Sequence, residues 1–336
     1  MAPTTPRAAV GIVSIGDMGL GIAKLLQAHG YEVLTTTVGR SPSTHARATS
    51  AGITVLPSDV ALVEKADYIL SIVPPRDAVQ TANRIIDAWS AASSRAASTP
   101  LYFLDLNAIA PSTARSIDAA LKSRAPSIRF VDGGIIGSPP KLLDDSQSQP
   151  PPDNVDAELD ASLSNWKRPS IPVSGPHPLS DATQSGPHLA AVLNIKHLSA
   201  EIGPASGLKA SFAALTKGFY ALALQSYTTA AQLGVLPELQ SQLSAAFPAT
   251  RAAADRGVVG MQHKAYRWEG EMREIGETFA TEGGWTGDGA IFDGIAEVYR
   301  TVAEETALGT PGGRKEGVED VVDELVRGLR KGGGEA

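Results

Sequence analysis

The first two hundred residues alternate short apolar strands with helices, and this alternation constrains the fold more than any other feature of the chain. Residues 8–15 read AAVGIVSI, a continuous apolar run bounded by a turn, which is typical of a buried parallel strand. Helix-like segments such as 58–66 and 76–93 separate the runs, so the sequence predicts an α/β domain with a doubly wound, mostly parallel sheet. Further strand-like runs are 31–38, 52–56, 66–74, 101–107 and 128–136.

The periodic pattern is interrupted at residues 141–169. This segment contains a proline triplet and several acidic residues, so we expect a disordered or mobile surface insertion. Strand patterns resume at 170–176 and 195–202, with a short helix at 188–193 between them. The first domain is therefore predicted to occupy residues 1–202.

Strand signals stop after this point. Residues 206–233 form one long helix pattern, and shorter helix patterns follow it. The sequence thus predicts an all-α second domain over residues 203–330, joined through a long interdomain helix, and a frayed tail at 331–336. The shorter helices are predicted at 237–246, 249–256, 268–282 and 288–307.

Composition narrows the classes of function. A chain of 336 residues with 43% hydrophobic residues can bury two cores, and a net charge of −7 without a basic block argues against bulk nucleic-acid or anionic-membrane binding. There is no cysteine, which excludes disulfides, thiolate nucleophiles and cysteine-ligated zinc. No apolar run reaches spanning length, so a cytoplasmic location is expected. We expect no metal, because no metal-like spacing is found among His177, His188, His197 and His263.

A glycine-rich turn joins the first strand to the first helix. In the dinucleotide-binding fingerprint G-x-G-x-x-G, the second glycine lets the backbone approach a diphosphate and the third permits close packing of helix on strand. Here serine replaces the first glycine, which is tolerable if the local φ is negative. The turn is still expected to hold a dinucleotide through backbone N–H groups at the helix N-terminus. Its residues are Ser14, Ile15, Gly16, Asp17, Met18 and Gly19.

The end of the second strand indicates which dinucleotide binds. An acidic residue there would bind the ribose of NAD, but no acid occurs between Glu32 and Asp59. The loop offers cationic and hydroxyl donors suited to a 2′-phosphate, so NADP(H) is predicted in preference to NAD(H). The alternative is that its arginines are solvated loop residues. The loop residues concerned are Gly39, Arg40, Ser41, Ser43, Thr44 and Arg47.

Two further segments follow strands whose carboxyl ends should face the nicotinamide. These are Val73-Pro74-Pro75 and the stretch that begins at Asn107. Asn107 could hydrogen-bond the carboxamide or the ribose, and the alternative is that it caps the next helix.

Three strings in the chain carry a family resemblance: DGGIIGSPP, SGLKASFAALTKGFYAL and YRWEGEMREIGETF. With the predicted layout, they resemble the β-hydroxyacid dehydrogenase and 6-phosphogluconate dehydrogenase superfamily. The nearest subgroup is the phosphogluconate dehydrogenase-like proteins with their own distinctive C-terminal domain. The resemblance implies a homodimeric enzyme that transfers hydride between NADPH and a small carbonyl or hydroxy compound.

Matched residue by residue, the resemblance implies that Lys209 is the catalytic lysine, but Ala213 stands where the family has asparagine. The family's substrate loop aligns with residues 132–138, where Ile136 replaces the substrate-binding serine and is followed by Gly137 and Ser138. The family's later Lys-Asp pair falls at Gly270-Glu271. Loss of hydrogen-bonding groups at these places suggests a substrate bulkier or less polar than a short hydroxy acid.

Lys209 as general acid or base would need a pKa lowered from about 10.4 by burial in an interdomain cleft. Lys217 is the second candidate. On an ideal helix, Lys209 shares a face with Ala213, Thr216 and Tyr220, which would line the substrate.

The opposite face of this helix, with Phe212, Leu215, Phe219 and Leu222, is expected to be core. Trp268 and Glu271 precede or open a later helix that could close over the substrate, although a tryptophan is more often core.

Two alternatives to carbonyl chemistry stay open. Imine reductases share the predicted architecture and need no carboxylate clamp. A nucleotide-binding sensor without turnover would also explain the departures at Ile136, Ala213 and Gly270.

Overall fold

The computed structural model describes residues 5–93, 100–143, 162–285, 290–310 and 312–332. The chain divides into two compact units, Met1–Lys209 and Ala210–Ala336. The division falls inside helix α8 (Pro204–Ala213), later than the boundary expected at residue 202. The first turns of α8 therefore belong with the first unit.

The first unit is built on an eight-stranded sheet with the order β3-β2-β1-β4-β5-β6-β9-β10. Neighbouring strands pair in parallel except β6 and β9, which are antiparallel. The predicted doubly wound, mostly parallel sheet is confirmed. The strands are β1 (Ala9–Val13), β2 (Glu32–Thr36), β3 (Thr54–Leu56), β4 (Tyr68–Ser71), β5 (Leu101–Asp105), β6 (Ile128–Gly133), β9 (Ile171–Ser174) and β10 (Ile195–His197).

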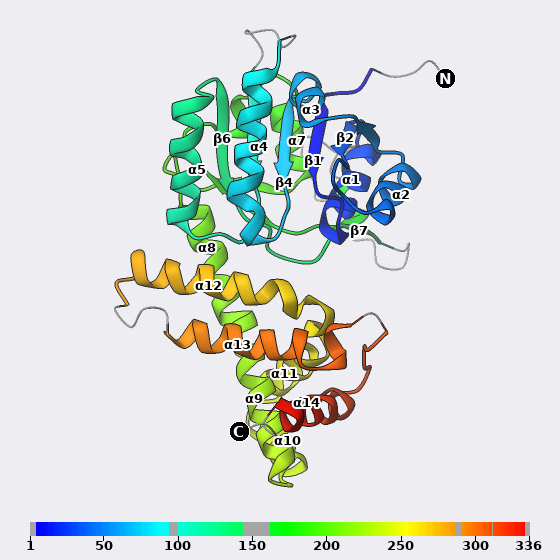
Figure 1. The fold of residues 1–336 in the computed structure, drawn as a ribbon, viewed down its shortest axis with the longest axis vertical. Coiled ribbons are helices and arrows are strands. Elements are labelled where there is room, and N and C mark those ends of the chain that lie inside the picture. The colour runs from blue at the N-terminus through cyan, green and yellow to red at the C-terminus, as the bar shows by residue number, and fades with distance from the viewer. Residues whose placement is uncertain (1–4, 94–99, 144–161, 286–289, 311, 333–336) are drawn as a thin grey trace. The chain divides into compact units, whose positions relative to one another are not determined.

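Helices cover both faces of this sheet (Figure 1). Tyr68 and Leu70 of β4 face one core, and Ile69 between them faces the other. Burial on both sides explains why the strands are continuously apolar rather than alternating. One face carries α1 (Asp17–Ala28) and α7 (Gly186–Val192); the other carries α3 (Asp59–Lys65), α4 (Ala78–Ala91) and α5 (Pro111–Arg124).

The strand order reverses between β1 and β4. After β3 the chain crosses back and adds β4 on the other side of β1, where Val13 lies beside Ser71. Loops that leave the carboxyl ends of β1 and β4 therefore diverge at this edge of the sheet. Ligands of open α/β sheets bind at such switch points.

The segment 141–169 is ordered at both ends, in contrast to the expected mobile insertion. The strands β7 (Lys141–Leu142) and β8 (Trp166–Lys167) pair antiparallel, and Leu163 is buried in the core beneath α1. The irregular composition of the segment hides these short anchors. Residues 144–161 lie outside the described part of the chain.

The second unit is helical, as predicted. The expected helix at 206–233 is present as α8, a π-helical turn (Ala214–Gly218) and α9 (Phe219–Gln232). The predicted tail is shorter than expected, because α14 continues to Gly332; residues 333–336 lie outside the described residues. The remaining helices are α10 (Leu236–Ala246), α11 (Pro248–Met261), α12 (Ala265–Thr281), α13 (Ala290–Glu304) and α14 (Val318–Gly332).

The face of the long helix that was expected to be core is largely exposed. Phe212, Leu215 and Leu222 are 46%, 82% and 51% exposed, and of that set Phe219 alone packs against the core, half-buried. Small residues, including Ala213 and Ala221, occupy the buried side instead. The hydropathy pattern identified the face with the large apolar residues. It could not show that the buried face is the one with small residues, which allow neighbouring helices to pack closely.

Within the described residues, no helix is both long and apolar enough to cross a membrane.

Candidate functional site

The glycine turn lies at the carboxyl end of β1, at the switch point of the sheet. Gly16 precedes α1 with φ −77°, and no side chain caps the first N–H groups of this helix. A Cβ added at Gly16 would meet no atom within 4 Å, whereas one at Gly19 would lie 2.2 Å from the Ser14 carbonyl oxygen. Packing therefore requires Gly19, but it leaves an open approach to the helix N-terminus at Gly16. This open approach fits a diphosphate group.

Ser14 does not adopt the negative φ under which its presence was expected to be tolerable. Its φ is +78°, in the left-handed region that favours glycine. The turn therefore keeps the backbone shape of the glycine fingerprint although the residue has changed.

The loop after β2 brings several of the predicted 2′-phosphate donors together. A turn in which the Arg40 N–H donates to the Thr37 carbonyl (3.0 Å) leads into α2 (Pro42–Ser50), with Gly39 at φ +72°. Ser41 caps this helix by accepting from the Thr44 N–H at 3.4 Å. The Arg40 side chain is exposed.

Arg47 lies one turn further along α2. Its Nη2 donates to the Thr44 hydroxyl at 3.4 Å, and its buried Nε makes no hydrogen bond with any described residue. A guanidinium group that contacts the Thr44 hydroxyl and keeps one nitrogen without a hydrogen bond fits the binding of an anionic group.

Asn107 follows β5 and is buried, with 3% of its surface exposed. Its amide donates to the Ser71 hydroxyl (2.9 Å) and to Asp105 Oδ2 (2.8 Å), and its Oδ1 accepts from the Val73 N–H (2.7 Å). Both amide hydrogens are thus used within the sheet edge. The alternative that Asn107 caps the next helix is wrong, because the N-cap of α5 is Ala110. The side chain instead fixes the Val73-Pro74-Pro75 segment.

Lys209 lies against the loop that follows β6. Its Nζ donates to the Ile135 carbonyl at 2.6 Å, and its stem covers Gly134, where an added Cβ would lie 2.8 Å from the lysine Cβ. Ile136 and Ser170 exchange backbone hydrogen bonds of 2.8 and 2.9 Å, which hold this loop in place. Gly137 and Ser138, next along the loop, are exposed. The structure therefore joins Lys209 to the predicted substrate loop within one unit.

A buried carboxylate that the sequence reasoning did not single out anchors α8. Asp132, fully buried at the end of β6, accepts from the Ser174 hydroxyl (2.9 Å), the Gly203 N–H (3.0 Å), and both the N–H (3.3 Å) and the hydroxyl (2.5 Å) of Ser206. Ser174 in turn accepts from the Ala205 N–H at 3.0 Å. Asp132 thereby fixes the helix that carries Lys209. The signal in the sequence that could have identified Asp132 is its position as the first residue of the segment aligned with the substrate loop.

In the second unit, the π-helical turn places Lys217 against Trp268 and Glu271 of α12, two residues predicted to line the substrate. Lys217 forms an ion pair with Glu271, and its Nζ lies 5.0 Å from the centre of the Trp268 ring. The Tyr299 hydroxyl donates to the Lys217 carbonyl at 2.5 Å, and burial, followed by the nearby Tyr220, raises the pKa of Tyr299. Tyr220 stacks on Trp268 with ring centres 6.3 Å apart. Trp268 is thus part of the core. Trp268 and Glu271 both lie inside α12, rather than before it or at its start.

The predicted polar face of the long helix is not a continuous lining. Ala213 is only 2% exposed and packs in the core of the second unit, so it is not available to a substrate. The Thr216 hydroxyl donates back to the Phe212 carbonyl at 3.0 Å. The π-helical turn explains part of this difference, because it breaks the spacing of an ideal α-helix.

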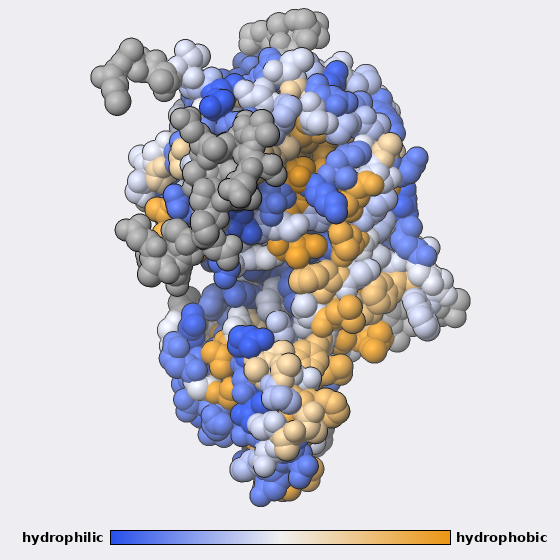
Figure 2. All heavy atoms as spheres, turned by 180° about the vertical axis from the view of Figure 1, so that it is seen from behind, coloured by the Kyte–Doolittle hydropathy of each residue, from blue (hydrophilic) through white to orange (hydrophobic). Residues whose placement is uncertain are grey.

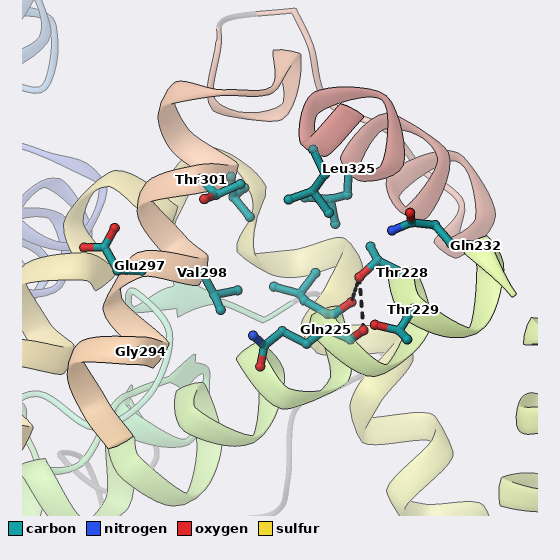
Figure 3. Close-up of a pocket in the computed structure, with 12 residues that line it drawn as sticks. Gln225, Thr228, Thr229, Gln232, Gly294, Glu297, Val298, Thr301 and Leu325 are labelled. Carbon is teal, nitrogen blue, oxygen red and sulfur yellow. Dashed lines mark hydrogen bonds between the residues drawn. The ribbon is translucent and has the colours of Figure 1, made fainter. Parts of the chain in front are cut away.

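A separate cavity of about 320 Å³ lies between α9, α13 and α14 of the second unit (Figure 3). Thr228 lies on its wall, and the hydroxyl donates to carbonyls of its own helix rather than into the cavity. None of the predicted site residues lines this cavity. In the described part of the chain, no group of three or more His, Asp or Glu residues is placed to hold a metal ion.

The fold and the glycine turn define a dinucleotide-binding protein, and comparisons with known proteins agree with this class. Residues 9–144 match the NAD binding domain of 6-phosphogluconate dehydrogenase, and residues 230–302 match a domain of unknown function, DUF1932. These two matches confirm the resemblance to the 6-phosphogluconate dehydrogenase-like proteins with a distinctive C-terminal domain. A comparison with curated proteins finds no match.

Solved structures share the fold over nearly the whole chain. A conserved hypothetical protein from Sinorhizobium meliloti is 19% identical, with a TM-score of 0.59 over 97% of this chain and 98% of that one. The 3-hydroxyisobutyrate dehydrogenase of Mycobacterium tuberculosis, solved with L-serine, is 17% identical, with a TM-score of 0.58 over 95% and 99%. The reductive aminase of Aspergillus terreus, solved with NADPH and ethyl-5-oxohexanoate, is 18% identical, with a TM-score of 0.50 over 94% and 98%.

Proposed function

We propose that the protein is an NADP-dependent oxidoreductase that transfers hydride between NADPH and a small carbonyl or hydroxy compound, with Lys209 as general acid or base. The observation that carries the proposal is the open helix N-terminus at Gly16, at the same sheet edge as Lys209. Strands β1 and β6 are three strand spacings apart, about 14 Å, so an elongated cofactor can reach from one to the other.

The chain's own residues would hold the cofactor at three places. The N–H groups of the glycine turn bind the diphosphate, and Arg40 and Arg47 bind the 2′-phosphate with help from Ser41 and Thr44. The backbone of the Val73 segment, fixed by Asn107, borders the nicotinamide end. When bound, NADPH supplies the hydride, and Lys209 gives a proton to the substrate oxygen.

The substrate pocket of this proposal is less polar than that of a hydroxy-acid enzyme. Ile136 offers no side-chain hydrogen bond on a loop held by backbone contacts with Ser170. A short carboxylate would lack a donor there, which favours a bulkier or less polar substrate. Trp268 packs in the core of the second unit, whereas Glu271, Thr216 and Tyr220 stay predicted substrate contacts.

The cofactor preference can be tested by measuring the dissociation constants of NADPH and NADH from the fluorescence of the reduced nucleotide. We expect Arg40→Ala and Arg47→Ala to raise the NADPH constant about tenfold each and to leave the NADH constant unchanged, because only NADPH carries the 2′-phosphate. Arg124→Ala, which removes an exposed partner of Asp87 near the opposite sheet edge, should change neither constant. Equal affinity of the unaltered protein for both nucleotides contradicts the preference.

Imine reduction is the second candidate, favoured by the same absence of a carboxylate clamp at Ile136. Ketones and cyclic imines offered with NADPH, and followed by loss of its absorbance, separate the two chemistries. NADPH binding without turnover of any compound in both sets supports a nucleotide sensor instead.

A homodimer is part of the proposal. Apolar side chains of the long helix are exposed, and hydrophobic residues gather on one face of the helical unit (Figure 2). Soluble monomers rarely leave such contiguous patches open, so a second copy of this chain is the proposed cover. Besides the exposed apolar residues named above, Leu208 of α8 is exposed, as are Leu233 and Val235, which follow the end of α9.

The dimer can be tested by light scattering after size exclusion. The expected mass at micromolar concentration is twice that of the 34.9 kDa chain. Leu215→Asp should shift the protein to the monomer, because it places a charge on the most exposed apolar residue of the helix. Val38→Asp makes the same change at an exposed site of the first unit and should leave the dimer intact. A monomeric unaltered protein contradicts the proposal.

A further inference from the structure

Ser14 holds a backbone conformation that its side chain disfavours. A non-glycine residue at φ +78° carries a cost of about 1–2 kcal/mol relative to glycine in the left-handed region. Residues held in this way are concentrated at functional sites, where the surrounding structure enforces them.

The surrounding structure does enforce the conformation. The Ser14 carbonyl packs directly against α1: its oxygen occupies the space that a Cβ at Gly19 would need. On the other side, β1 is paired with β4 up to Val13, whose carbonyl accepts from the Ile72 N–H at 3.3 Å. The chain must therefore turn sharply at residue 14, and glycine would serve the turn better than serine.

The Ser14 side chain belongs to the turn that the proposed function assigns to the dinucleotide. It is half-buried at the carboxyl edge of β1, in the same turn as the open approach at Gly16. Its hydroxyl makes no hydrogen bond with any residue that the structure describes, although buried and half-buried hydroxyls elsewhere in the unit, such as those of Thr35 and Ser174, are bonded. An enforced strain together with an unused donor points to a function for the hydroxyl itself.

We propose that the Ser14 hydroxyl donates a hydrogen bond to a diphosphate oxygen of the bound dinucleotide. The glycine of the fingerprint supplies only the backbone shape of the turn. Serine keeps this shape and adds a side-chain contact to the ligand. This inference rests on the proposed function, since it requires that the turn binds a dinucleotide, and it adds a side-chain determinant of affinity to the backbone N–H groups.

Two substitutions separate the hydroxyl from the strain. Ser14→Ala removes the hydroxyl and keeps a Cβ at the positive φ, so we expect the NADPH dissociation constant to rise about tenfold with no gain in thermal stability. Ser14→Gly removes both, so the same loss of affinity should accompany a rise of about 2 °C in the unfolding midpoint measured without nucleotide.

Ser185 provides the matched control, because it also has a positive φ (+58°). It precedes α7, and its hydroxyl donates to the Arg7 carbonyl at 3.3 Å, near the amino end of β1 and so at the opposite edge of the sheet. Ser185→Gly should leave NADPH affinity unchanged. If the unaltered protein binds NADPH and Ser14→Ala binds it equally well, the role of the hydroxyl is overturned and the proposed function stands. If the unaltered protein does not bind NADPH, both fail.

Discussion

Lys209→Met is expected to lower kcat by at least about 100-fold while leaving the NADPH dissociation constant within about twofold of the original. Methionine preserves the unbranched stem that covers Gly134, so the loop after β6 should keep its position. It removes the ammonium group that donates to the Ile135 carbonyl, and with it the proton for the substrate oxygen. Turnover is measured by NADPH absorbance on the best substrate of the ketone and imine sets, and binding by nucleotide fluorescence.

The lysine prediction has two controls. Lys122→Met makes the same change on exposed α5 and should leave both quantities unchanged. Lys217→Met tests the second candidate lysine: it leaves the Glu271 carboxylate buried without its partner, so we expect a loss of stability in addition to any loss of turnover. Full activity of Lys209→Met would remove this residue from the mechanism and make Lys217 the first candidate.

The elements of the first unit could be predicted from sequence because their signals are local. Apolar runs marked the strands, and the spacing of Gly16 and Gly19 marked the turn. The antiparallel placement of β9 was not accessible, because a run of residues does not carry its direction in the sheet. The sign of φ at Ser14 was equally hidden, since it is imposed by α1 packing on the carbonyl rather than by serine itself.

The contacts that define the candidate site are long-range. Lys217 and Glu271 were both candidates, but nothing in the sequence paired residues 54 positions apart. The buried face of the long helix was assigned to its large apolar residues, whereas the structure buries alanines such as Ala210 and Ala213 there. Helix periodicity shows that a helix has an apolar face. Which face is buried depends on the elements that pack against the helix.

A second large effect is expected at Asp132. Asp132→Ala should lower the stability of the first unit by about 3–5 kcal/mol, because it leaves buried N–H and hydroxyl donors without an acceptor at the start of α8. Asp132→Asn keeps one carbonyl oxygen for the N–H groups of Gly203 and Ser206, so a smaller loss of about 1–2 kcal/mol is expected.

The stability loss at Asp132 should be concentrated where α8 meets the sheet. Amide hydrogen exchange of residues 203–209 in the full chain measures it locally, and exchange there should accelerate more in Asp132→Ala than in Asp132→Asn. Asp87→Ala removes an exposed carboxylate paired with Arg124 and should change exchange little. Because α8 carries Lys209, a variant that loosens this turn should also lose turnover. Unchanged exchange in Asp132→Ala would show that the carboxylate does not hold the helix, and the position of Lys209 would then depend on the Ile135 loop alone.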